Sequence, residues 1–258
     1  MNFDKYTEEM KKSIWDKAFF MDKIIGAKCV VDFGCADGAL ICMLADMFPE
    51  MRFYGYDHLP EMIIRAKANA RPNTFFYNSW EFNDMCSNIK SAFEPDEICI
   101  NFSSVLHEVF SYYASSGKTN IEYMVKELRP KYITIRDMYY DGKSPYLRWG
   151  RVNEIIETMN IDPSYIDDFE RFHGSIATEK GMLHFLMKYQ WRDNGWKQEL
   201  DENYFSWNLM MLLDIIGSYE TLFEAHYLLP YYAEKWKEIN LSPTYRHTHA
   251  QFILRREN

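Results

Sequence analysis

The stretch VVDFGCADGAL, at residues 30–40, joins a run of β-branched residues to a turn that contains two glycines and two acids. Gly34 and Gly38 allow the backbone to turn sharply and let a ligand approach the N-terminus of a following helix. Loops of this kind often hold phosphate groups. Here Asp32 and Asp37 flank the turn, and a carboxylate repels an anion at short range. The sequence therefore predicts a ligand-binding loop with an unusual charge.

Two classes of cofactor bind to motifs that consist of a strand, a glycine-containing turn and an acidic residue further along the chain. For a dinucleotide, Gly34, Ala36 and Ala39 form a degraded G-x-G-x-x-G/A pattern, and Asp57, about 20 residues on, would hold a ribose. The two aspartates beside the loop would cost a pyrophosphate roughly a few kcal/mol in a partly desolvated site. For S-adenosylmethionine, the ammonium and the sulfonium are both positive, and Asp57 can still accept hydrogen bonds from the ribose. The electrostatics favour S-adenosylmethionine.

A histidine and several polar residues follow later apolar runs. His107 and Glu108 come soon after the run EICINF, and His107 is a candidate general base there. Alternatively, Ser103 or Ser104 caps a helix whose first turns contain this pair. Ser103 is also a candidate contact of the cofactor. Asp137, at the end of the run YITIRD, either touches the substrate or pairs with a neighbour. His107 and Asp137 are the catalytic candidates.

No metal site is predicted. The stretch HEVFS lacks the second histidine of a zinc-binding H-E-x-x-H motif. His247 and His249 would share one face of a strand, but no third ligand is in view, so we expect a surface pair.

Strand-like and helix-like patterns alternate over roughly the first 140 residues. Five apolar runs predict buried strands: CVVDF (29–33), RFYGYD (52–57), TFFYN (74–78), EICINF (97–102) and KYITIRDM (131–138). Helical patterns separate most of them, which favours an α/β fold with a doubly wound parallel sheet. Such a sheet binds its ligand at the carboxyl ends of the strands. The residues that follow each strand should therefore converge.

The pattern changes after Met138. Residues 141–203 have helical periods, no clear strand and many aromatic side chains. We interpret them as a helical insertion that acts as a lid or a substrate-recognition element within one domain spanning residues 1–258. The other expected elements are a helix at residues 4–25, a helix at 204–216, and two final strands, YETLFEAHYLL (219–229) and HAQFILRR (249–256).

Four stretches, in order, resemble motifs of the class I S-adenosylmethionine-dependent methyltransferases. VVDFGCADG is similar to the first motif of that family, and YGYDHLPEMIIRAK to the acidic second motif with its helix. EICINFSSVLHEV resembles the fourth-strand motif, and YITIRDM the fifth strand. The resemblance covers about residues 30–138 and the two final strands. It implies a Rossmann-like, seven-stranded, mostly parallel sheet whose last strand is antiparallel, with S-adenosylmethionine as the cofactor.

The resemblance also implies roles for the residues that match these motifs. The methionine end of the cofactor would be shaped by Asp32, Gly34, Ala36 and Gly38. Asp57 would hold the ribose hydroxyls, and His58 or Leu59 would lie against the adenine. After the third strand the family often has an acid that accepts the adenine amino group. Asn78, Ser79 and Trp80 stand there in this sequence, where Asn78 could accept a hydrogen bond and Trp80 could stack.

The composition limits the function classes. The chain has 258 residues, is 47% hydrophobic and suits one globular domain, with no run of about 18 apolar residues that could span a bilayer. Its N-terminus has no apolar signal region. Five cysteines without a C-x-x-C pair predict reduced thiols in the cytoplasm. A net charge of −9 disfavours a broad nucleic-acid surface.

We therefore expect an enzyme that transfers a methyl group from S-adenosylmethionine to a small or medium-sized molecule by in-line displacement. Methylation of an RNA base or a protein side chain is an alternative, as is a non-catalytic, cofactor-binding regulatory module. The sequence leaves the acceptor, the pathway and the oligomeric state open.

Overall fold

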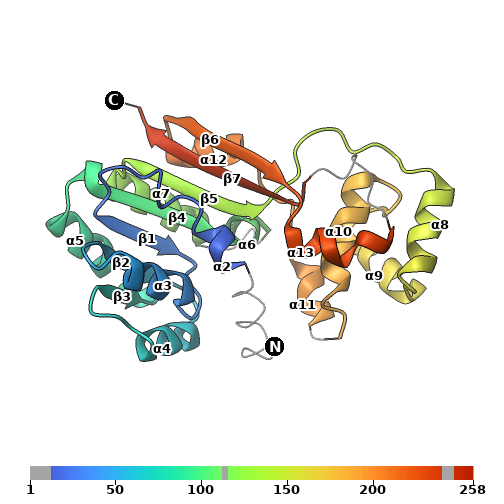
Figure 1. Ribbon diagram of the computed structural model, residues 1–258, viewed down its shortest axis with the longest axis horizontal. Coiled ribbons are helices and arrows are strands. Elements are labelled where there is room, and N and C mark those ends of the chain that lie inside the picture. Colours follow the sequence, from blue (N-terminus) through green and yellow to red (C-terminus); the bar gives the residue numbers. More distant parts are fainter. Residues whose placement is uncertain (1–12, 112–115, 194, 240–246, 258) are drawn as a thin grey trace.

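The computed structural model describes residues 13–111, 116–193, 195–239 and 247–257. Its centre is a seven-stranded sheet in the order β3-β2-β1-β4-β5-β7-β6 (Figure 1). The strands are β1 Cys29–Phe33, β2 Arg52–Tyr56, β3 Thr74–Tyr77, β4 Ile98–Ser103, β5 Tyr132–Met138, β6 Tyr219–Tyr227 and β7 His249–Arg256. The first five strands are parallel, and β7 pairs antiparallel with both β5 and β6. This confirms the predicted Rossmann-like, doubly wound sheet.

Helices cover both faces of this sheet. Val30 and Val31 are adjacent and fully buried, yet they belong to different hydrophobic clusters, because successive side chains of a strand point to opposite faces. The cluster of Val30 includes residues of α3 Ala39–Met47 and α4 Pro60–Ala68. The cluster of Val31 includes residues of α5 Phe82–Ala92, α6 Leu106–Ser111, α7 Gly117–Leu128 and α12 Leu209–Ile216.

A row of polar side chains crosses the buried sheet. Asp32 in β1, Asn101 in β4 and Thr134 in β5 are register partners. The Asn101 side-chain amide donates to the Asp32 carboxylate at 2.7 Å, and the Thr134 hydroxyl donates to Asn101 at 2.9 Å. Buried polar groups are tolerated when they are hydrogen-bonded. The row therefore fixes the direction of Asp32 close to the carboxyl end of its strand.

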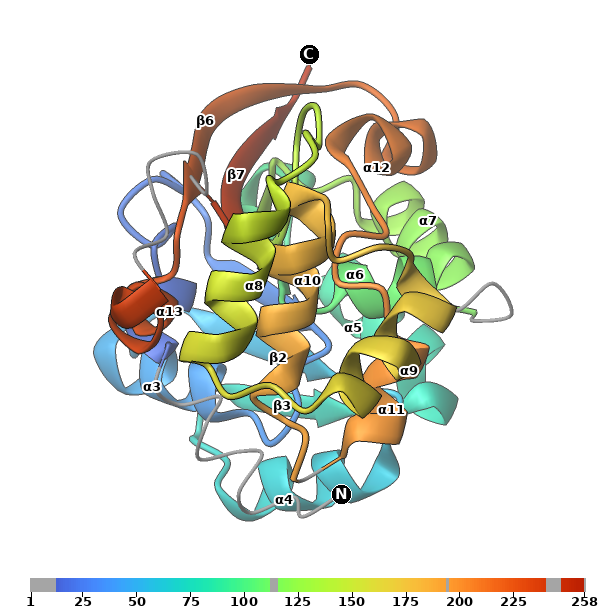
Figure 2. The same cartoon turned by 90° about the vertical axis from the view of Figure 1, so that its right-hand side faces the viewer.

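A helical lobe lies beside the carboxyl ends of the parallel strands (Figures 1 and 2). The predicted insertion supplies α8 Trp149–Thr158, α9 Pro163–His173, α10 Glu179–Tyr189 and α11 Trp196–Asp201. The segment between β6 and β7 supplies α13 Pro230–Lys235 and η3 Lys237–Ile239. Tyr232 and Trp236 stack with ring centroids 4.5 Å apart and share a buried cluster with Phe169 of α9. The lobe thus has its own hydrophobic core, built from two separate stretches of sequence.

The N-terminal helix is shorter than predicted. Only α2 Ile14–Lys17 is helical within the described part of the predicted helix, and residues 18–25 form turns and a bend. Residues 4–12 of that prediction lie outside the described residues. Among the described residues, no helix is both long and apolar enough to cross a membrane.

Local capping explains where two helices of the C-terminal half begin. Asp162 caps α9 by accepting the Ser164 amide, as its position before Pro163 indicates. The helix predicted to begin at residue 204 instead begins at Leu209, because the Asn208 side chain accepts the Met211 amide.

Gly38, in the turn after β1, is expected to be sensitive to substitution. Its φ is 73°, and an added Cβ would lie 2.6 Å from the Phe76 ring. We expect Gly38→Ala to lower the free energy of unfolding by about 2–4 kcal/mol, from left-handed strain and overpacking together. Gly26 has a φ of 86° but only Lys131 Nζ within reach, at 3.9 Å. Gly26→Ala should therefore cost about 1–2 kcal/mol in urea titrations. Equal losses in the two variants would contradict the steric explanation.

Candidate active site

A cavity of about 1130 Å³ lies at the carboxyl ends of β1, β2, β4 and β5. The strand ends and the loops after them form one part of its wall. The helical lobe contributes Trp191 and Tyr232, the segment after α11 contributes Glu202, and α2 contributes Lys17. Most small-molecule pockets measure about 300–1,000 Å³. The cavity is therefore large enough for a cofactor and a second molecule together.

The turn after β1 is tied to the end of β2. The backbone amides of Gly34 and Cys35 both donate to the Tyr56 carbonyl, at 2.8 and 2.9 Å. The Asp57 carboxylate accepts the Ala36 amide on one oxygen and the Leu59 amide on the other, both at 2.9 Å. Burial raises the pKa of Asp57, and the two amide hydrogen bonds oppose this rise. Asp57 thus shapes the turn and keeps acceptor lone pairs for a ligand, since a carboxylate offers about four sites.

Asp32 and Lys17 place opposite charges in the wall of the cavity. Burial raises the pKa of Asp32 to about 6, while the Asn101 hydrogen bond and Lys17 oppose the rise. Burial, together with Arg136, lowers the pKa of Lys17 to about 8. Near neutral pH the two side chains are ionised, so this part of the cavity suits a zwitterionic group.

Acids dominate the lining of the cavity as a whole. Two lining residues are Lys or Arg, and seven are acidic: Asp16, Asp32, Asp37, Asp57, Glu108, Glu199 and Glu202. In a site partly removed from water, such an excess attracts cations and repels phosphates. The cavity therefore favours a positively charged ligand.

Two buried polar atoms of the lining have no hydrogen-bond partner among the described residues: Ser103 Oγ and Arg136 Nη2. The other guanidinium nitrogens of Arg136 donate to Asp16 at 2.6 Å and to the Ser104 hydroxyl at 2.9 Å. Since Ser103 Oγ has no partner in the described part of the chain and Ser104 Oγ accepts from Arg136, the structure shows neither Ser103 nor Ser104 as the cap of α6. Buried polar groups without partners are rare, and a ligand is one way to satisfy them.

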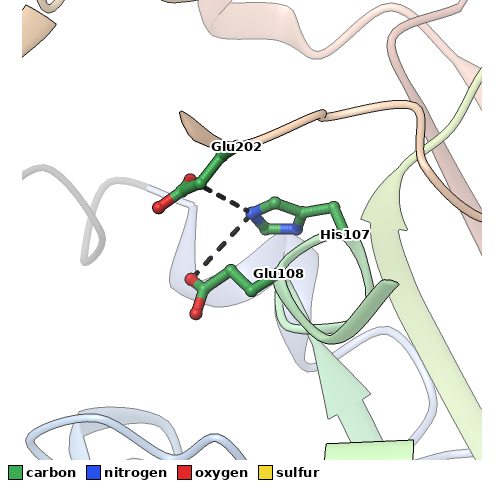
Figure 3. A group of neighbouring side chains, drawn as sticks. All are labelled: His107, Glu108 and Glu202. Atoms are coloured by element: carbon green, nitrogen blue, oxygen red, sulfur yellow. Dashed lines mark ion pairs between the residues drawn. The ribbon is translucent and has the colours of Figure 1, made fainter. Parts of the chain in front are cut away.

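His107, in α6, is held from beneath by Asp137. One Asp137 oxygen lies 2.7 Å from His107 Nδ1, and the other accepts the His107 backbone amide at 3.1 Å. The opposite ring nitrogen, Nε2, lies 3.9 Å from Glu108 and 4.0 Å from Glu202 (Figure 3). Burial opposes a charge on the ring, but Asp137 and the two glutamates raise the pKa of His107 to about 9. Withdrawal from water raises the pKa of Glu108 to about 8.

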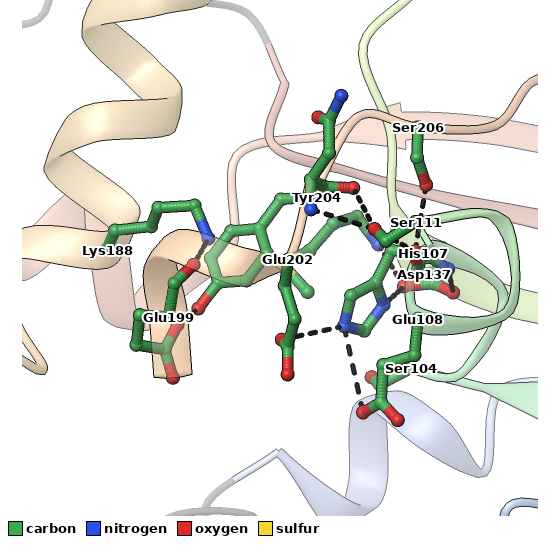
Figure 4. A network of polar contacts seen from close by, with 12 residues as sticks. Ser104, His107, Glu108, Ser111, Asp137, Lys188, Glu199, Glu202, Tyr204 and Ser206 are labelled. Atoms are coloured by element: carbon green, nitrogen blue, oxygen red, sulfur yellow. Dashed lines mark hydrogen bonds and ion pairs between the residues drawn. The ribbon is translucent and has the colours of Figure 1, made fainter. Parts of the chain in front are cut away.

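Polar contacts join His107 to the helical lobe (Figure 4). Tyr204 stands edge-on to His107 with ring centroids 5.6 Å apart, and its hydroxyl donates to the Glu199 carboxylate. Lys188 Nζ lies 3.8 Å from the centre of the Tyr204 ring and donates to the Glu199 carbonyl. The Ser206 hydroxyl donates to the His107 carbonyl at 2.8 Å. The lobe and the sheet therefore meet at this histidine.

Seven of the residues predicted from the sequence line the cavity: Asp32, Gly34, Ala36, Asp57, His58, Ser103 and His107. They converge because parallel strands end at one edge of the sheet. Ala36 has a φ of 48°, so the non-glycine residue of the turn adopts the left-handed conformation that a glycine adopts more easily. The binding and catalytic roles of these residues stay predictions.

Asn78, Ser79 and Trp80 are not brought to the cavity. The Asn78 side chain accepts the amides of Trp80 and Glu81 and so caps a short 3₁₀ helix. The Ser79 hydroxyl donates to the His58 carbonyl at 3.3 Å. Trp80 is 78% exposed. All three side chains thus have local surroundings in this structure, because Asn after a strand satisfies the next turn as readily as it binds a ligand. Their roles as cofactor contacts stay predictions.

Three other residues lie in surroundings that the sequence did not determine. Gly38 lies against the Phe76 ring and is not part of the cavity lining. Asp137 is 0% exposed and pairs with His107, one of the two alternatives that the sequence left open. His249, expected at the surface, is buried in β7 and lines the cavity. The proposed roles of Gly38 and Asp137 stay predictions, whereas the location of His249 was predicted wrongly.

Several residues of the site were missed at the level of sequence. Lys17 lies in a short helix, and no sequence pattern indicates which of its side chains face the cavity. Glu202 lies in the stretch QELDEN, where no feature of the sequence distinguishes it from the neighbouring acidic residues. Tyr204 was assigned to a helix that begins five residues later, at Leu209. The many aromatic side chains of the insertion were the only sequence signal for this part of the site. They indicated that the inserted helices take part in it but did not identify individual residues.

No protein-family profile matches the sequence, and no curated protein matches it. Solved structures do match the fold. An S-adenosylmethionine-dependent methyltransferase from Mesorhizobium loti is 12% identical, with a TM-score of 0.50 over 95% of this chain and 98% of that chain.

A second match is one chain of a Haloferax volcanii complex between the Trm112 methyltransferase activator and a proposed methyltransferase. It is 13% identical, with a TM-score of 0.54 over 99% of this chain and 96% of that chain. Identities this low establish the architecture and leave the activity to be argued from the site. The chain therefore has the class I methyltransferase fold.

Proposed function

We propose that the protein is an S-adenosylmethionine-dependent methyltransferase that acts on a small or medium-sized molecule. The observation that carries the proposal is the excess of carboxylates around a cavity at the carboxyl ends of the strands. A diphosphate there would lie beside Asp32, Asp37 and Asp57, whereas a sulfonium and an ammonium would be attracted to them. The fold supports the proposal, since the Mesorhizobium loti structure that shares it is an S-adenosylmethionine-dependent methyltransferase.

The residues present fit this cofactor. Asp57 has acceptor capacity left for the ribose hydroxyls after it has accepted two backbone amides. Asp32 would hold the ammonium group. Lys17 and the unpartnered Nη2 of Arg136 would hold the methionine carboxylate. When bound, the cofactor supplies a methyl group that is already activated for displacement.

The remaining task of the protein is to position the acceptor and exclude water. His107 presents Nε2 to the cavity, and Asp137 fixes its orientation, which makes His107 the group best placed to hold an acceptor. With a pKa of about 9 the ring carries a proton near neutral pH, so His107 would deprotonate an acceptor only as the pH rises towards 9. We propose the helical lobe as the lid or recognition element, because its side chains complete the wall. The acidic lining and the net charge of −9 favour a small acceptor over RNA.

A cytoplasmic location is part of the same proposal. All five cysteines are free and buried in the structure. Thiols persist in a reducing compartment, and burial protects them further.

Calorimetry with S-adenosylmethionine and S-adenosylhomocysteine, with NAD as the control, tests the proposed cofactor. Binding of both sulfur compounds and not of NAD is expected. Binding of NAD alone would refute the assignment. Tight binding without methyl transfer to any molecule of a cell extract would instead favour the non-catalytic module.

Asp32 should give cofactor binding a pH dependence. With a pKa near 6, Asp32 loses its charge as the pH falls, and only the ionised form attracts an ammonium. We expect the affinity for S-adenosylhomocysteine, whose sulfur is neutral, to fall below pH 6 towards about tenfold per pH unit. Asp32→Asn should bind weakly and show a flat profile by calorimetry between pH 5 and 7.5. An unchanged acid limb in this variant would assign the titration to another group.

A further inference from the structure

We propose that His107, Glu108 and Glu202 form a binding site for a divalent transition-metal cation in the wall of the cavity. The first two residues come from α6, and Glu202 comes from the segment after α11, so folding brings the three together (Figure 3). One imidazole nitrogen and one oxygen of each glutamate lie within 4.8 Å of one another. All three residues line the cavity, so a bound cation would be accessible to ligands there.

The distances suit a shared cation. His107 Nε2 is 3.9 Å from one glutamate oxygen and 4.0 Å from the other, and the two oxygens are at most 4.8 Å apart. A point equidistant from three atoms with these separations is no more than about 2.5 Å from each. Bonds from zinc to nitrogen or carboxylate oxygen measure about 2.0–2.2 Å. Movements of a few tenths of an ångström would therefore complete the site.

The orientation of His107 is the second, independent observation. Its side chain is 5% exposed, and Asp137 binds Nδ1 from the side opposite the glutamates. Nε2 has no hydrogen-bond partner within 3.5 Å among the described residues, although it is directed at two carboxylates (Figure 4). A histidine that binds a metal almost always has its other ring nitrogen held by a carboxylate or carbonyl in this way. Asp137 thus supplies the support that a metal ligand needs.

Charge and donor type indicate the kind of cation. Three carboxyl groups surround a single imidazole, and the two glutamates that face Nε2 would balance the charge of a divalent ion that displaced the protons of the cluster. Carboxylate oxygens suit Mg²⁺, Ca²⁺ and Mn²⁺, and imidazole suits Zn²⁺ and other transition metals, so this mixed set of donors favours Mn²⁺ or Zn²⁺. With three protein ligands the cation keeps open positions towards the cavity. Oxygen atoms of the methyl acceptor would take these positions; this last step rests on the proposed function.

The test is binding of Mn²⁺ to the full-length protein after dialysis against EDTA, followed by electron paramagnetic resonance. We expect one Mn²⁺ per chain, and an affinity at least about tenfold lower in Glu202→Gln because a ligand is lost. Asp137→Asn should lower the affinity by about 10–100-fold through the orientation of His107.

A second group of similar composition provides the control. Asp141, Glu224 and His226 also have ligand atoms within 4.8 Å of one another, but the two acids are exposed. Glu224→Gln should leave Mn²⁺ binding unchanged. The inference is overturned if the wild type binds no Mn²⁺ up to roughly 1 mM, or if Glu224→Gln abolishes binding while Glu202→Gln retains it. The affinity for S-adenosylhomocysteine is measured on the same EDTA-treated protein. If the protein binds S-adenosylhomocysteine but no Mn²⁺, the metal site is wrong and the proposed function stands.

Discussion

Replacement of Asp57 by Asn is expected to weaken S-adenosylhomocysteine binding by about 10²–10³-fold. The carboxylate accepts the amides of Ala36 and Leu59 and, in the proposed complex, both ribose hydroxyls. An asparagine has one acceptor oxygen, so its NH₂ group must face some of these donors. Hydrogen bonds to charged groups contribute about 1.5–3 kcal/mol each. Two such hydrogen bonds at the lower end of this range contribute about 3–4 kcal/mol together. Their loss corresponds to an affinity that is lower by about 10²–10³-fold.

Asp37→Asn is the matched control for this measurement. It removes the same charge from the same turn, and Asp37 also lines the cavity, but it is not assigned to the ribose. A loss of only a few-fold is expected in calorimetry, with thermal unfolding of both variants recorded alongside. If both variants lose affinity equally, cofactor binding depends on the total negative charge of the cavity, and the proposed hydrogen bonds from the ribose to Asp57 are wrong.

The sequence predicted the part of the site that sheet topology determines. Asp32, Asp57 and His107 follow or end three strands whose apolar runs are unmistakable, and parallel strands deliver their carboxyl ends to one edge. The strand register adds the partner of Asp32: Asn101 lies opposite it in β4 and donates to its carboxylate, and Thr134 in β5 holds Asn101 in turn. For these residues, position along the chain was sufficient to indicate position in space.

The rest of the site depends on packing that no local pattern encodes. Glu202 reaches His107 because the lobe folds against the carboxyl edge of the sheet, and its helices carry their apolar contacts on other faces. No helix is predicted between the two final strands, yet α13 lies there and its Tyr232 packs in the core of the lobe. For Asn78 the sequence could not separate two roles, since the residue types that cap helices are the same ones that bind ligands.

Asp137→Asn is expected to reduce methyl transfer by about 10²–10⁴-fold with little change in cofactor affinity. One Asp137 oxygen contacts His107 Nδ1 at 2.7 Å and the Met138 amide at 2.6 Å, and the other accepts the His107 amide. An asparagine must turn its NH₂ group towards one of these partners. If it faces Nδ1, the ring proton moves to Nε2. His107 could then neither accept a proton from an acceptor nor bind a cation.

Three measurements separate this positioning role from a loss of fold. Transfer of labelled methyl groups to a small-molecule extract should fall, and calorimetry with S-adenosylhomocysteine should change little. ¹⁵N NMR of the histidine rings, recorded above the His107 pKa of about 9 where the ring is neutral, should show the proton moved to Nε2. Ile135→Val, in the same buried strand, should cost about 0.5–1.5 kcal/mol of stability without altering the other readouts. Wild-type protonation of His107 together with wild-type turnover in Asp137→Asn would leave Asp137 with a purely structural role. Burying a carboxylate is costly unless it is hydrogen-bonded. Of the side chains that the structure describes, the one that Asp137 binds is a histidine that faces the cavity, which favours the functional role.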